Sequence, residues 1–350
     1  MATPEVTVMG GGIFGLSVAY ACARRGARVR LIEARTIGAG SSGGPVGALA
    51  PHVPDNWNEK KQFQFESLVL AERFWAEVTE IGGLTTGYAR CGRLQPLADD
   101  TAVALARARV AQAATHWGDA AVWQVRAAAD FAGWLPESGS GLAVWDDLSA
   151  RIDPRRALAA LAAALRELGG EIVLGAAPAQ GAVVWATGYE GLVALSASLG
   201  RNIGGGVKGQ ALRLRLAATE RPQLFVAGLH VVPHEDGTVA VGSTSERSFA
   251  SGEAGAVDGQ LDALLAKAVA AVPALAGAEV VGRWAGVRPR AASRAPLLGR
   301  WPGRPGHFVA NGGFKIGFGL APKVGEVMAA QVLEDIDRIP DGFRLATTAG

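Results

Sequence analysis

The pattern of hydrophobic and polar residues at the start of the chain predicts a strand, a helix and a second strand in succession. Residues 6–9 form a short run typical of a buried strand, and residues 16–26 carry the spacing of a helix. Residues 29–32 predict another strand, which runs into an acid, Glu33. This order is typical of the first unit of an α/β fold with a parallel sheet.

The same pattern predicts further elements along the chain. Apolar residues recur at helical spacing over 63–81, and an alanine-rich stretch over 101–115 predicts a helix with a solvated arginine face. Asp153 and Pro154 suit the first turn of a helix that runs to about residue 168. Strands are also expected at 93–97, 171–174 and 182–188, the last of which finishes in a small-residue turn, and a helix is expected at 261–272.

Residues 207–250 change to short strand-like segments, spaced as in an antiparallel meander. Its strands are expected at 207–214, 223–226, 229–233 and 238–242. The last third returns to glycine-rich loops followed by helical patterns, so a β-rich domain is expected inside a discontinuous nucleotide-binding domain. We assign 1–85, 141–206 and 277–350 to the nucleotide-binding domain, and 86–140 and 207–276 to a substrate domain.

Three glycines between the first strand and helix carry the first candidate chemistry. Gly10, Gly12 and Gly15 form a G-x-G-x-x-G motif, which allows a tight turn and a close approach of backbone amides to a pyrophosphate. The N-terminus of the following helix would face the same anion, and the Glu33 carboxylate could accept hydrogen bonds from ribose hydroxyls. Motif, helix and acid together predict a bound dinucleotide.

The segment 38–51 consists mainly of glycine and other small residues. This composition suits an extended loop, without helix or strand, that lies close against a ligand. A flexible linker is the alternative. We favour the ligand loop because the segment directly follows the ribose acid, where a long cofactor would run.

Length and composition indicate a globular protein of two packed domains. The 350 residues are 49% hydrophobic and 19% charged. The net charge of +2 gives no indication of binding to nucleic acid or to a membrane surface. Cys22 is expected in the core and Cys91 in the substrate domain, and this pair forms no disulfide framework or metal site. We expect a cytoplasmic protein without a signal peptide or transmembrane segment.

The C-terminal third contains a second set of motifs. Residues 284–289 read WAGVRP, 295–299 read APLLG and 307–322 read HFVANGGFKIGFGLAP. With the N-terminal glycine motif, they resemble the FAD-dependent D-amino-acid oxidase superfamily over nearly the whole chain, most closely its glycine-oxidase-like branch. The resemblance implies a Rossmann-type FAD-binding domain with an inserted antiparallel β-rich substrate domain, α/β in class and α+β overall.

The resemblance also implies how the cofactor is held. FAD is expected to bind without a covalent bond, because Cys91 lies in the presumed substrate domain, the C-terminal flavin block contains no cysteine, and the motif around His52 does not match the covalent members. The N-terminus of the helix after residues 315–319 would stabilise negative charge at the flavin N1–C2=O edge. The short connection 175–181 removes some family contacts near the adenine. The expected FAD contacts are Gly10, Gly12, Ile13, Phe14, Gly15, Glu33, Ala34, Arg35, Ser41, Ser42, Gly43, Gly47, Ala48, Leu49, Thr187, Gly188, Lys315, Ile316, Gly317, Phe318 and Gly319.

Three residues are implied in catalysis. Arg288 matches the family arginine that clamps a substrate carboxylate through two parallel hydrogen bonds, and the alternative is a surface arginine at a strand end. His230 stands where the family commonly has a tyrosine, and it would either assist Arg288 or simply pack in its strand. Lys315 stands in place of a family arginine and keeps the positive charge.

Two further residues are implied in the substrate pocket. Ser245 matches a position that is bulkier and apolar in glycine oxidases, so the pocket is expected to be roomier or more polar. His52 is either a pocket histidine or a loop cap. Residues 208–210, by contrast, match the family's connection into the β-rich domain, and we expect them to be structural.

These residues favour oxidation of the C–N bond of a small amine or amino acid of the glycine, sarcosine or D-amino-acid type. Hydride would pass to flavin N5, and O2 or a quinone would accept the electrons. The alternative within the fold is processing of a carboxymethylamino group on a larger substrate such as modified tRNA. A nicotinamide dehydrogenase would need no WAGVRP block, and a non-catalytic flavin-binding protein is a further alternative.

Overall fold

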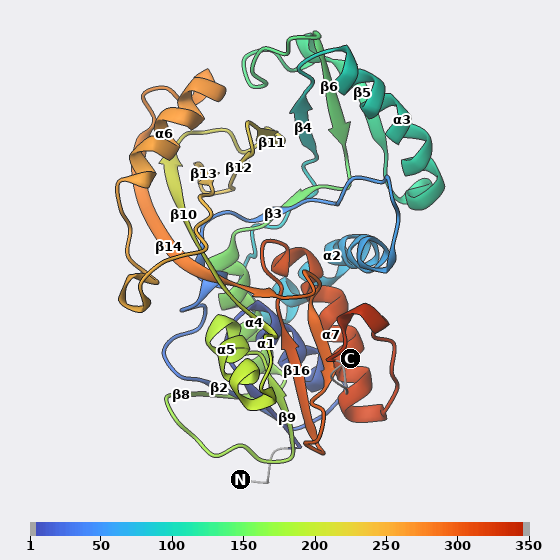
Figure 1. The fold of residues 1–350 in the computed structure, drawn as a ribbon, viewed down its shortest axis with the longest axis vertical. Coiled ribbons are helices and arrows are strands. Elements are labelled where there is room, and N and C mark those ends of the chain that lie inside the picture. The colour runs from blue at the N-terminus through green and yellow to red at the C-terminus, as the bar shows by residue number, and fades with distance from the viewer. Residues whose placement is uncertain (1–4, 346–350) are drawn as a thin grey trace.

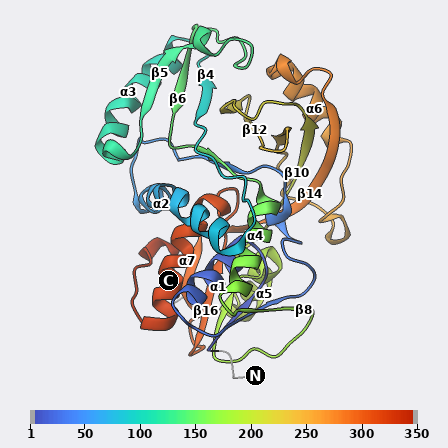
Figure 2. The same ribbon diagram turned by 180° about the vertical axis from the view of Figure 1, so that it is seen from behind.

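The computed structural model describes residues 5–345, which fold around two large β-sheets. In Figure 1 one half of the molecule, at the bottom, holds most of the helices, and the other half, at the top, holds the second sheet. Figure 2 shows from behind that each half combines segments far apart in the sequence. The chain therefore passes between the halves several times.

A six-stranded sheet in the order β15–β16–β9–β1–β2–β8 forms the centre of the lower half. Neighbouring strands run parallel, except that β15 pairs antiparallel with β16 at one edge. The strands are β1 (Val6–Met9), β2 (Val29–Glu33), β8 (Glu171–Leu174), β9 (Ala182–Trp185), β15 (Leu297–Arg300) and β16 (His307–Asn311). This sheet confirms the expected Rossmann-type part of the fold.

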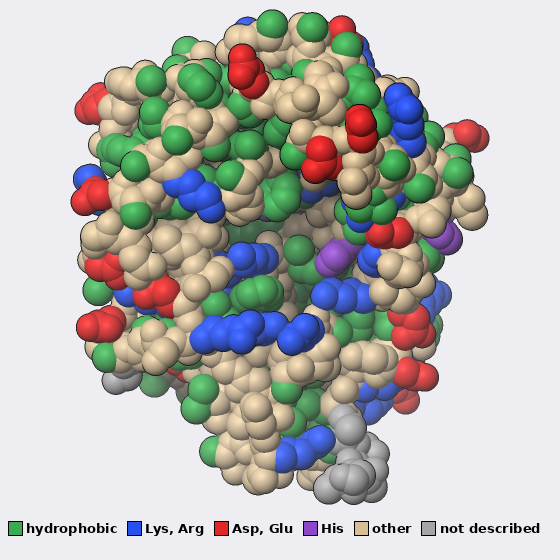
Figure 3. All heavy atoms as spheres, turned by 45° about the horizontal axis from the view of Figure 1, so that its top comes forward, with side chains coloured by type: hydrophobic (Ala, Val, Ile, Leu, Met, Phe, Trp, Pro, Cys, Tyr) green, Lys and Arg blue, Asp and Glu red, His purple; other side chains and the backbone are tan. Residues whose placement is uncertain are grey.

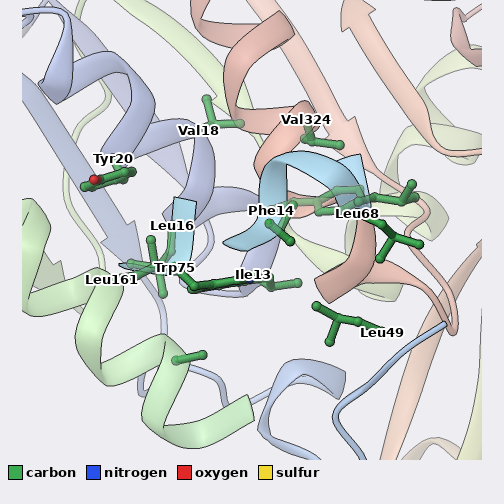
Figure 4. Close-up of a cluster of buried hydrophobic side chains, with 14 of the residues drawn as sticks. Ile13, Phe14, Leu16, Val18, Tyr20, Leu49, Leu68, Trp75, Leu161 and Val324 are labelled. Atoms are coloured by element: carbon green, nitrogen blue, oxygen red, sulfur yellow. The ribbon is translucent and has the colours of Figure 1, made fainter. Parts of the chain in front are cut away.

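The helices of the lower half, packed on this sheet or on one another, form apolar clusters with it. They are α1 (Ile13–Arg24), α2 (Glu59–Gly82), α4 (Pro154–Glu167), α5 (Gly188–Leu199) and α7 (Gly317–Glu334). Helix α1 packs against α4 and α7, and α2 packs against the same two helices. Figure 4 shows Leu16 of α1 close to Trp75 of α2 and Leu161 of α4, and Val18 of α1 on the side of Val324 of α7, all of them fully buried.

An eight-stranded sheet in the order β14–β10–β13–β12–β11–β4–β6–β5 forms the upper half. Its pairs are antiparallel except β11–β4, which is parallel. Helices α3 (Asp100–Trp117) and α6 (Gln260–Ala271) pack against β5 and β10 respectively. The strands are β4 (Arg93–Pro96), β5 (Trp123–Ala127), β6 (Leu142–Asp146), β10 (Gly204–Arg215), β11 (Gln223–Val226), β12 (Leu229–Pro233), β13 (Thr238–Gly242) and β14 (Glu279–Ala291).

Several short elements complete the fold. Strand β3 (Ala48–Leu49) pairs antiparallel with β7 (Ala150–Arg151). The 3₁₀ turns are η1 (Ser41–Gly43), η2 (Gly118–Ala120), η3 (Ala128–Phe131), η4 (Ser251–Glu253), η5 (Pro273–Leu275) and η6 (Asp341–Phe343). The glycine-rich segment 38–51 therefore contains η1 and β3, which corrects the expectation of a loop without regular structure.

Most of the expected elements are confirmed. The three meander strands β11, β12 and β13 have the expected bounds, and α4 begins with Pro154 after Asp153, whose carboxylate accepts hydrogen bonds from the N–H groups of Arg155 (3.0 Å) and Arg156 (3.3 Å). Cys22 is fully buried, as expected, and Cys91 is partly buried; both are free thiols.

Other elements differ from the expectation. The first helix begins at Ile13 rather than at residue 16, because the glycine turn leads straight into it. Strands β5 and β6 and helix α5 were not expected. Strands β6 and β14 belong to the eight-stranded sheet, although both lie in segments assigned to the nucleotide-binding domain. Pairing places them there, since β6 joins β4 and β5, and β14 pairs with β10 along its whole length.

Within residues 5–345, no helix combines the length and the apolar character needed to cross a membrane. The same part of the chain contains no cluster of three or more His, Cys, Asp or Glu side chains arranged to hold a metal ion.

Candidate active site

A cavity of about 1080 Å³ runs between the two sheets. It begins at the carboxyl ends of β1 and β2, where open parallel sheets commonly bind ligands, and it continues under the eight-stranded sheet. Figure 3 shows the hollow near the centre of one face, with Lys and Arg side chains around its lower edge and a histidine at its right-hand side.

The first end of the cavity is built from the glycine turn and α1. A Cβ atom on Gly10 would overlap the carbonyl oxygen of Ala186, and one on Gly15 would overlap the carbonyl oxygen of Gly10. The N-cap residue of α1 is Gly12, which has no side chain to cap the helix, and the N–H of Ile13 donates to Ser42 Oγ (3.1 Å). The first turn of α1 therefore faces the cavity with the partial positive charge that suits a pyrophosphate.

Glu33 is fixed by two backbone groups. Its Oε2 accepts a hydrogen bond from the N–H of Gly11 (2.7 Å), and its Oε1 accepts one from the N–H of Arg35 (2.9 Å). A carboxylate has about four acceptor positions, so acceptor capacity is left for ribose hydroxyls at the cavity wall. Arg35 also pairs with Glu190 (3.8 Å) at this end.

The segment 38–51 forms the middle of the wall. A Cβ atom on Gly47 would overlap the carbonyl oxygen of Ile152, so the loop packs directly against the chain before α4. His234 Nε2 lies 2.9 Å from the carbonyl oxygen of Pro45 and ties the loop to the β-rich half. This close packing supports the expected ligand loop over a flexible linker.

The far end of the cavity meets the N-terminus of α7. Its N-cap residue is Ile316, which provides no side-chain cap, and Gly317 and Phe318 of the first turn line the cavity. Lys315 lines it as well, with Nζ 5.9 Å from the centre of the Phe314 ring. A helix N-terminus and an ammonium group thus face the same space, an arrangement that stabilises negative charge there.

One row of residues across the eight-stranded sheet forms the ceiling of the cavity. Trp284, Ala211, Gly242, His230 and Phe225 lie directly opposite one another on five adjacent strands, and all five line the cavity. Residues at matching positions in adjacent strands point to the same face of a sheet. Pairing register alone therefore brings segments more than seventy residues apart into one surface.

Arg288 lies on the same face of β14, four residues beyond Trp284, and is only 7% exposed. Its Nη2 donates to Ser243 Oγ (2.7 Å) and to the carbonyl oxygen of Thr244 (3.1 Å), whereas its Nη1 is buried without a partner among residues 5–345. The guanidinium lies over Gly209, whose Cβ it would overlap. Burial lowers the pKa of Arg288 to about 10, so the side chain is positively charged at neutral pH.

His230 has a buried Nδ1 that likewise lacks a hydrogen-bond partner within the described residues. Its ring lies 4.8 Å from that of Phe225. Burial, followed by the nearby charges of Arg93 and Lys315, lowers the pKa of His230 to about 4. The imidazole is therefore neutral at physiological pH and can donate one hydrogen bond and accept another.

His52 is held by Gln64 of α2, which is only 2% exposed. Gln64 Oε1 accepts from the backbone N–H of His52 (2.9 Å) and contacts His52 Nδ1, while Gln64 Nε2 donates to the carbonyl oxygen of Ala50 (3.0 Å). Because Oε1 can only accept, Nδ1 carries the proton and Nε2 of the neutral ring is an acceptor. Burial lowers the pKa of His52 and favours this neutral form.

Arg93 of β4 also lines the cavity. Its Nε donates to Asp146 Oδ2 of the neighbouring strand (2.9 Å), and the second oxygen of this fully buried carboxylate accepts from the N–H of Ser149 (2.9 Å). The charge of Arg93 is therefore balanced inside the protein, unlike that of Arg288.

Most of the residues expected at the site do line this cavity. The five that do not are Gly15, Gly43, Leu49, Gly319 and Ser245. Ser245 is an exposed residue between two residues paired with β10, since the N–H groups of Thr244 and Glu246 donate to the carbonyl oxygens of Gln210 and Lys208. Ser243 lies at the cavity wall, where Ser245 was expected, and it contacts Arg288. The residues that do line it are Gly10, Gly12, Ile13, Phe14, Glu33, Ala34, Arg35, Ser41, Ser42, Gly47, Ala48, His52, Thr187, Gly188, His230, Arg288, Lys315, Ile316, Gly317 and Phe318.

The cavity residues missed by sequence reasoning include Gln64, Arg93 and Phe225. Gln64 carried a signal, because it stands on the stripe of α2 that continues with Leu68, Ala71 and Trp75 and is otherwise apolar. A polar residue on a buried stripe indicates a hydrogen-bonded role. Arg93 and Phe225 carried no such signal, since their positions depend on the pairing of strands distant in sequence.

Comparisons with known proteins agree with this geometry. The sequence profile of the family described as FAD dependent oxidoreductase matches residues 5–331. The glycine oxidase of Geobacillus kaustophilus is 28% identical over 98% of this chain and 95% of its own length. The putative thiamine biosynthesis oxidoreductase ThiO of Rhizobium etli is 32% identical over 95% of this chain and 97% of its own length.

Solved structures share the fold. The crystal structure of the Geobacillus kaustophilus glycine oxidase superposes with a TM-score of 0.82 over 99% of both chains, at 23% identity. That of iminodiacetate oxidase from Chelativorans sp. BNC1 has a TM-score of 0.81 over 97% of this chain and 98% of its own, at 21% identity. The L-α-glycerophosphate oxidase of Mycoplasma pneumoniae, solved with FAD bound, has a TM-score of 0.76 over 99% of this chain and 100% of its own, at 17% identity.

The cavity residues fit FAD. The uncapped N-terminus of α1 beside the Gly10 turn suits a pyrophosphate, Glu33 has acceptors left for a ribose, and α7 with Lys315 suits the flavin edge that becomes negative. The family match covers nearly the whole chain. The chain therefore belongs to the family of FAD-dependent oxidoreductases and is an enzyme that uses FAD.

Proposed function

We propose that this enzyme oxidises the C–N bond of a small amino acid or N-alkylated glycine whose carboxylate binds Arg288. The observation that carries the proposal is the buried, unpartnered Nη1 of Arg288 at the cavity wall. A buried cation without a counterion costs several kcal/mol, and a substrate carboxylate removes that cost. Bound FAD supplies the hydride acceptor, and the protein supplies binding and orientation.

The surroundings of Arg288 support a clamp with a fixed direction. Ser243 and Thr244 occupy Nη2, so the guanidinium cannot rotate freely, and Nη1 is left for the ligand. A charge-assisted hydrogen bond in a buried site is stronger than one in water. In this proposal Arg288 sets the position of the substrate α-carbon, and positioning of this kind accounts for much of the rate gain in such reactions.

His230 is proposed as the second substrate contact. Its Nδ1 lies buried on the ceiling of the cavity without a partner, and its low pKa keeps the ring neutral. A neutral ring can bond to either the carboxylate or the amine of a substrate, depending on its tautomer. Phe225 beside it adds an apolar ring to the ceiling.

At the other end, we propose that Lys315 and the first turn of α7 hold the pyrimidine edge of the flavin. Partial burial and the charge of Arg288 lower the pKa of Lys315. In this proposal Lys315 serves the cofactor and Arg288 serves the substrate, and this division explains why two cations lie near each other. The Gly10 turn, α1 and Glu33 are proposed to hold the adenosine diphosphate part.

The names of the relatives support the same class of substrate, since they include glycine oxidases and an iminodiacetate oxidase. The experiment is anaerobic mixing of the FAD-loaded protein with glycine, sarcosine, D-alanine and D-proline, followed by flavin absorbance. Bleaching by one of them, followed by recovery with O2 or with a quinone, supports the proposal and identifies the acceptor. A flavin that stays oxidised with every amino acid and N-alkylglycine tested contradicts it.

A further inference from the structure

A cluster of positive side chains stands at the rim of the cavity, outside the residues assigned above. Lys60 is at the start of α2, Arg290 near the end of β14, and Arg294 in the turn that follows β14. None of the three forms an ion pair with any residue in the part of the chain that the structure describes. The cluster adjoins the cavity wall, because Arg290 lies over the ring of Phe314, which lines the cavity.

These cations are held close together by the fold. Lys60 Nζ donates a hydrogen bond to the carbonyl oxygen of Arg294 (2.7 Å), which fixes α2 against the turn after β14. Burial, followed by the charges of Arg290 and Arg294, lowers the pKa of Lys60. Like charges gathered without an acid cost free energy in the empty protein, and an anion between them would recover it.

The cluster continues inward to the carboxylate site. Arg290 Cζ lies 5.5 Å from the centre of the Phe314 ring, and Lys315 Nζ lies 5.9 Å from the same ring. Arg288 and Arg290 are two residues apart on β14, so they share a face of the strand at a spacing of about 7 Å. The buried Arg288 is the inner end of this line, and the half-exposed Arg290 is its outer end.

We propose that Lys60, Arg290 and Arg294 bind a second anionic group of the substrate. The substrate is then an amino acid with two acidic groups: one carboxylate on Arg288, and a carboxylate, phosphonate or phosphate at the rim. This inference rests on the proposed function, because it uses the same cavity and the same anchor. It excludes Arg93 as the second site, since Asp146 already balances that charge.

Binding can be measured without turnover. Isothermal titration calorimetry of the FAD-loaded protein with malonate, succinate, glutarate and adipate, each against the monocarboxylate of equal length, tests the rim directly. We expect at least one dicarboxylate to bind more than about tenfold more tightly than its monocarboxylate, with an advantage that shrinks as salt is raised. Equal affinities at low salt would overturn the inference.

Substitutions of the three rim residues test whether they cause the tighter binding of the dicarboxylate. Arg290→Gln and Arg294→Gln should each weaken the chosen dicarboxylate about threefold, and the triple variant with Lys60→Gln more than about tenfold, while the monocarboxylate changes by less than twofold. Removing like charges relieves repulsion, so these variants should fold. Arg107→Gln is the control, because Arg107 is an exposed α3 residue without an ion pair in the described part of the chain. An equal loss for both ligands, or an equal effect of Arg107→Gln, would overturn the inference.

Turnover then shows which part of the substrate carries the second acid. D-Glutamate against D-glutamine tests an acid on the α-carbon, and N-(2-carboxyethyl)glycine against N-propylglycine tests an acid on the nitrogen substituent. We expect the acidic member of one pair to have the higher kcat/KM, and the triple variant to remove that preference. If no amino acid reduces the flavin, the proposed function fails, while the calorimetry still decides whether the rim binds dianions.

Discussion

At the scale of single residues, the site depends on a glycine, Gly209, whose lack of a side chain leaves room for the Arg288 guanidinium. The Arg288 guanidinium occupies the place where a Cβ of Gly209 would stand, and it is held there by Ser243 and Thr244. Gly209 has extended backbone in β10, so its role is space rather than backbone freedom. Residues 208–210, which we expected to be structural, therefore leave through Gly209 the space that the Arg288 guanidinium occupies, and Arg288 is the proposed substrate clamp.

Gly209→Ala should displace the Arg288 guanidinium while leaving the FAD site unchanged. We expect kcat/KM for carboxylate substrates to fall on the order of 100-fold, with unchanged flavin content, because a shift of about 1 Å in an anchoring group costs this much. Steady-state kinetics and the flavin absorbance of the purified variant measure both quantities.

Gly205→Ala is the matched control for this substitution. Gly205 lies on the same strand, and a Cβ atom there would meet no atom within 4 Å. Activity equal to that of the parent in Gly209→Ala, or an equal loss in both variants, would show that Gly209 does not position Arg288.

The sequence predicted the cofactor end of the site better than the contacts of Arg288 and His52, for a physical reason. The glycine turn and Glu33 follow local rules of chain geometry, and the residues expected there line the cavity with the exception of Gly15. The partners of Arg288 and His52 depend on contacts between distant segments. Ser243 was therefore missed in favour of Ser245, and Gln64 was not expected at all.

At the scale of elements, local pattern predicted strands whose faces are uniformly buried. Strands β11 to β13 were predicted with their observed bounds, and β12 and β13 are almost wholly buried. Strand β14 was not predicted as a strand, since glycine, proline and arginine interrupt its pattern. Of those residues, Arg288 and Pro289 line the cavity, so part of the apolar alternation that identifies a strand is replaced by residues of the site.

The parallel-to-antiparallel junction at β4 contains the buried pair of Arg93 and Asp146. Arg93→Met should reduce the free energy of unfolding by about 3–5 kcal/mol, because it leaves a buried carboxylate without its counterion. The double variant Arg93→Met/Asp146→Asn should recover part of the loss, since the amide oxygen can still accept from the N–H of Ser149. Urea unfolding followed by tryptophan fluorescence measures these differences.

The control is Arg126→Met, which removes an exposed pair with Asp130 within the same half of the molecule. We expect a loss below about 1 kcal/mol there. A loss of similar small size in Arg93→Met would show that the buried pair contributes no more than a surface one.

At the scale of the whole molecule, two sheets enclose one cavity, and three histidines lie in its wall or next to it. Burial is the main cause that lowers the pKa of His52, His230 and His234, that of His230 to about 4. The unfolded chain binds a proton at each of them near pH 6.5, before the folded protein does. Stability therefore falls as the pH is lowered from about 6.5 toward 4.

Urea unfolding at constant excess FAD, between pH 7 and pH 5, tests this dependence. The free energy of unfolding should fall toward pH 5 with a slope of up to about 1.4 kcal/mol per pH unit for each such histidine, and His230→Gln should reduce the slope. A free energy of unfolding that stays level or rises as the pH is lowered would contradict the assignment of neutral buried histidines.

The most direct test of the central claim is the rate of anaerobic flavin reduction by one substrate with and without its carboxylate. Sarcosine and sarcosine amide should be compared in stopped flow, in the parent enzyme and in Arg288→Met, each loaded with FAD. If another amino acid bleaches the flavin better, that acid and its amide form the pair. We predict that the acid reduces the parent flavin far faster than the amide does, and that Arg288→Met keeps FAD but loses this preference. Equal rates for acid and amide in the parent, or a preference that survives in Arg288→Met, would contradict the role of Arg288 as the substrate anchor.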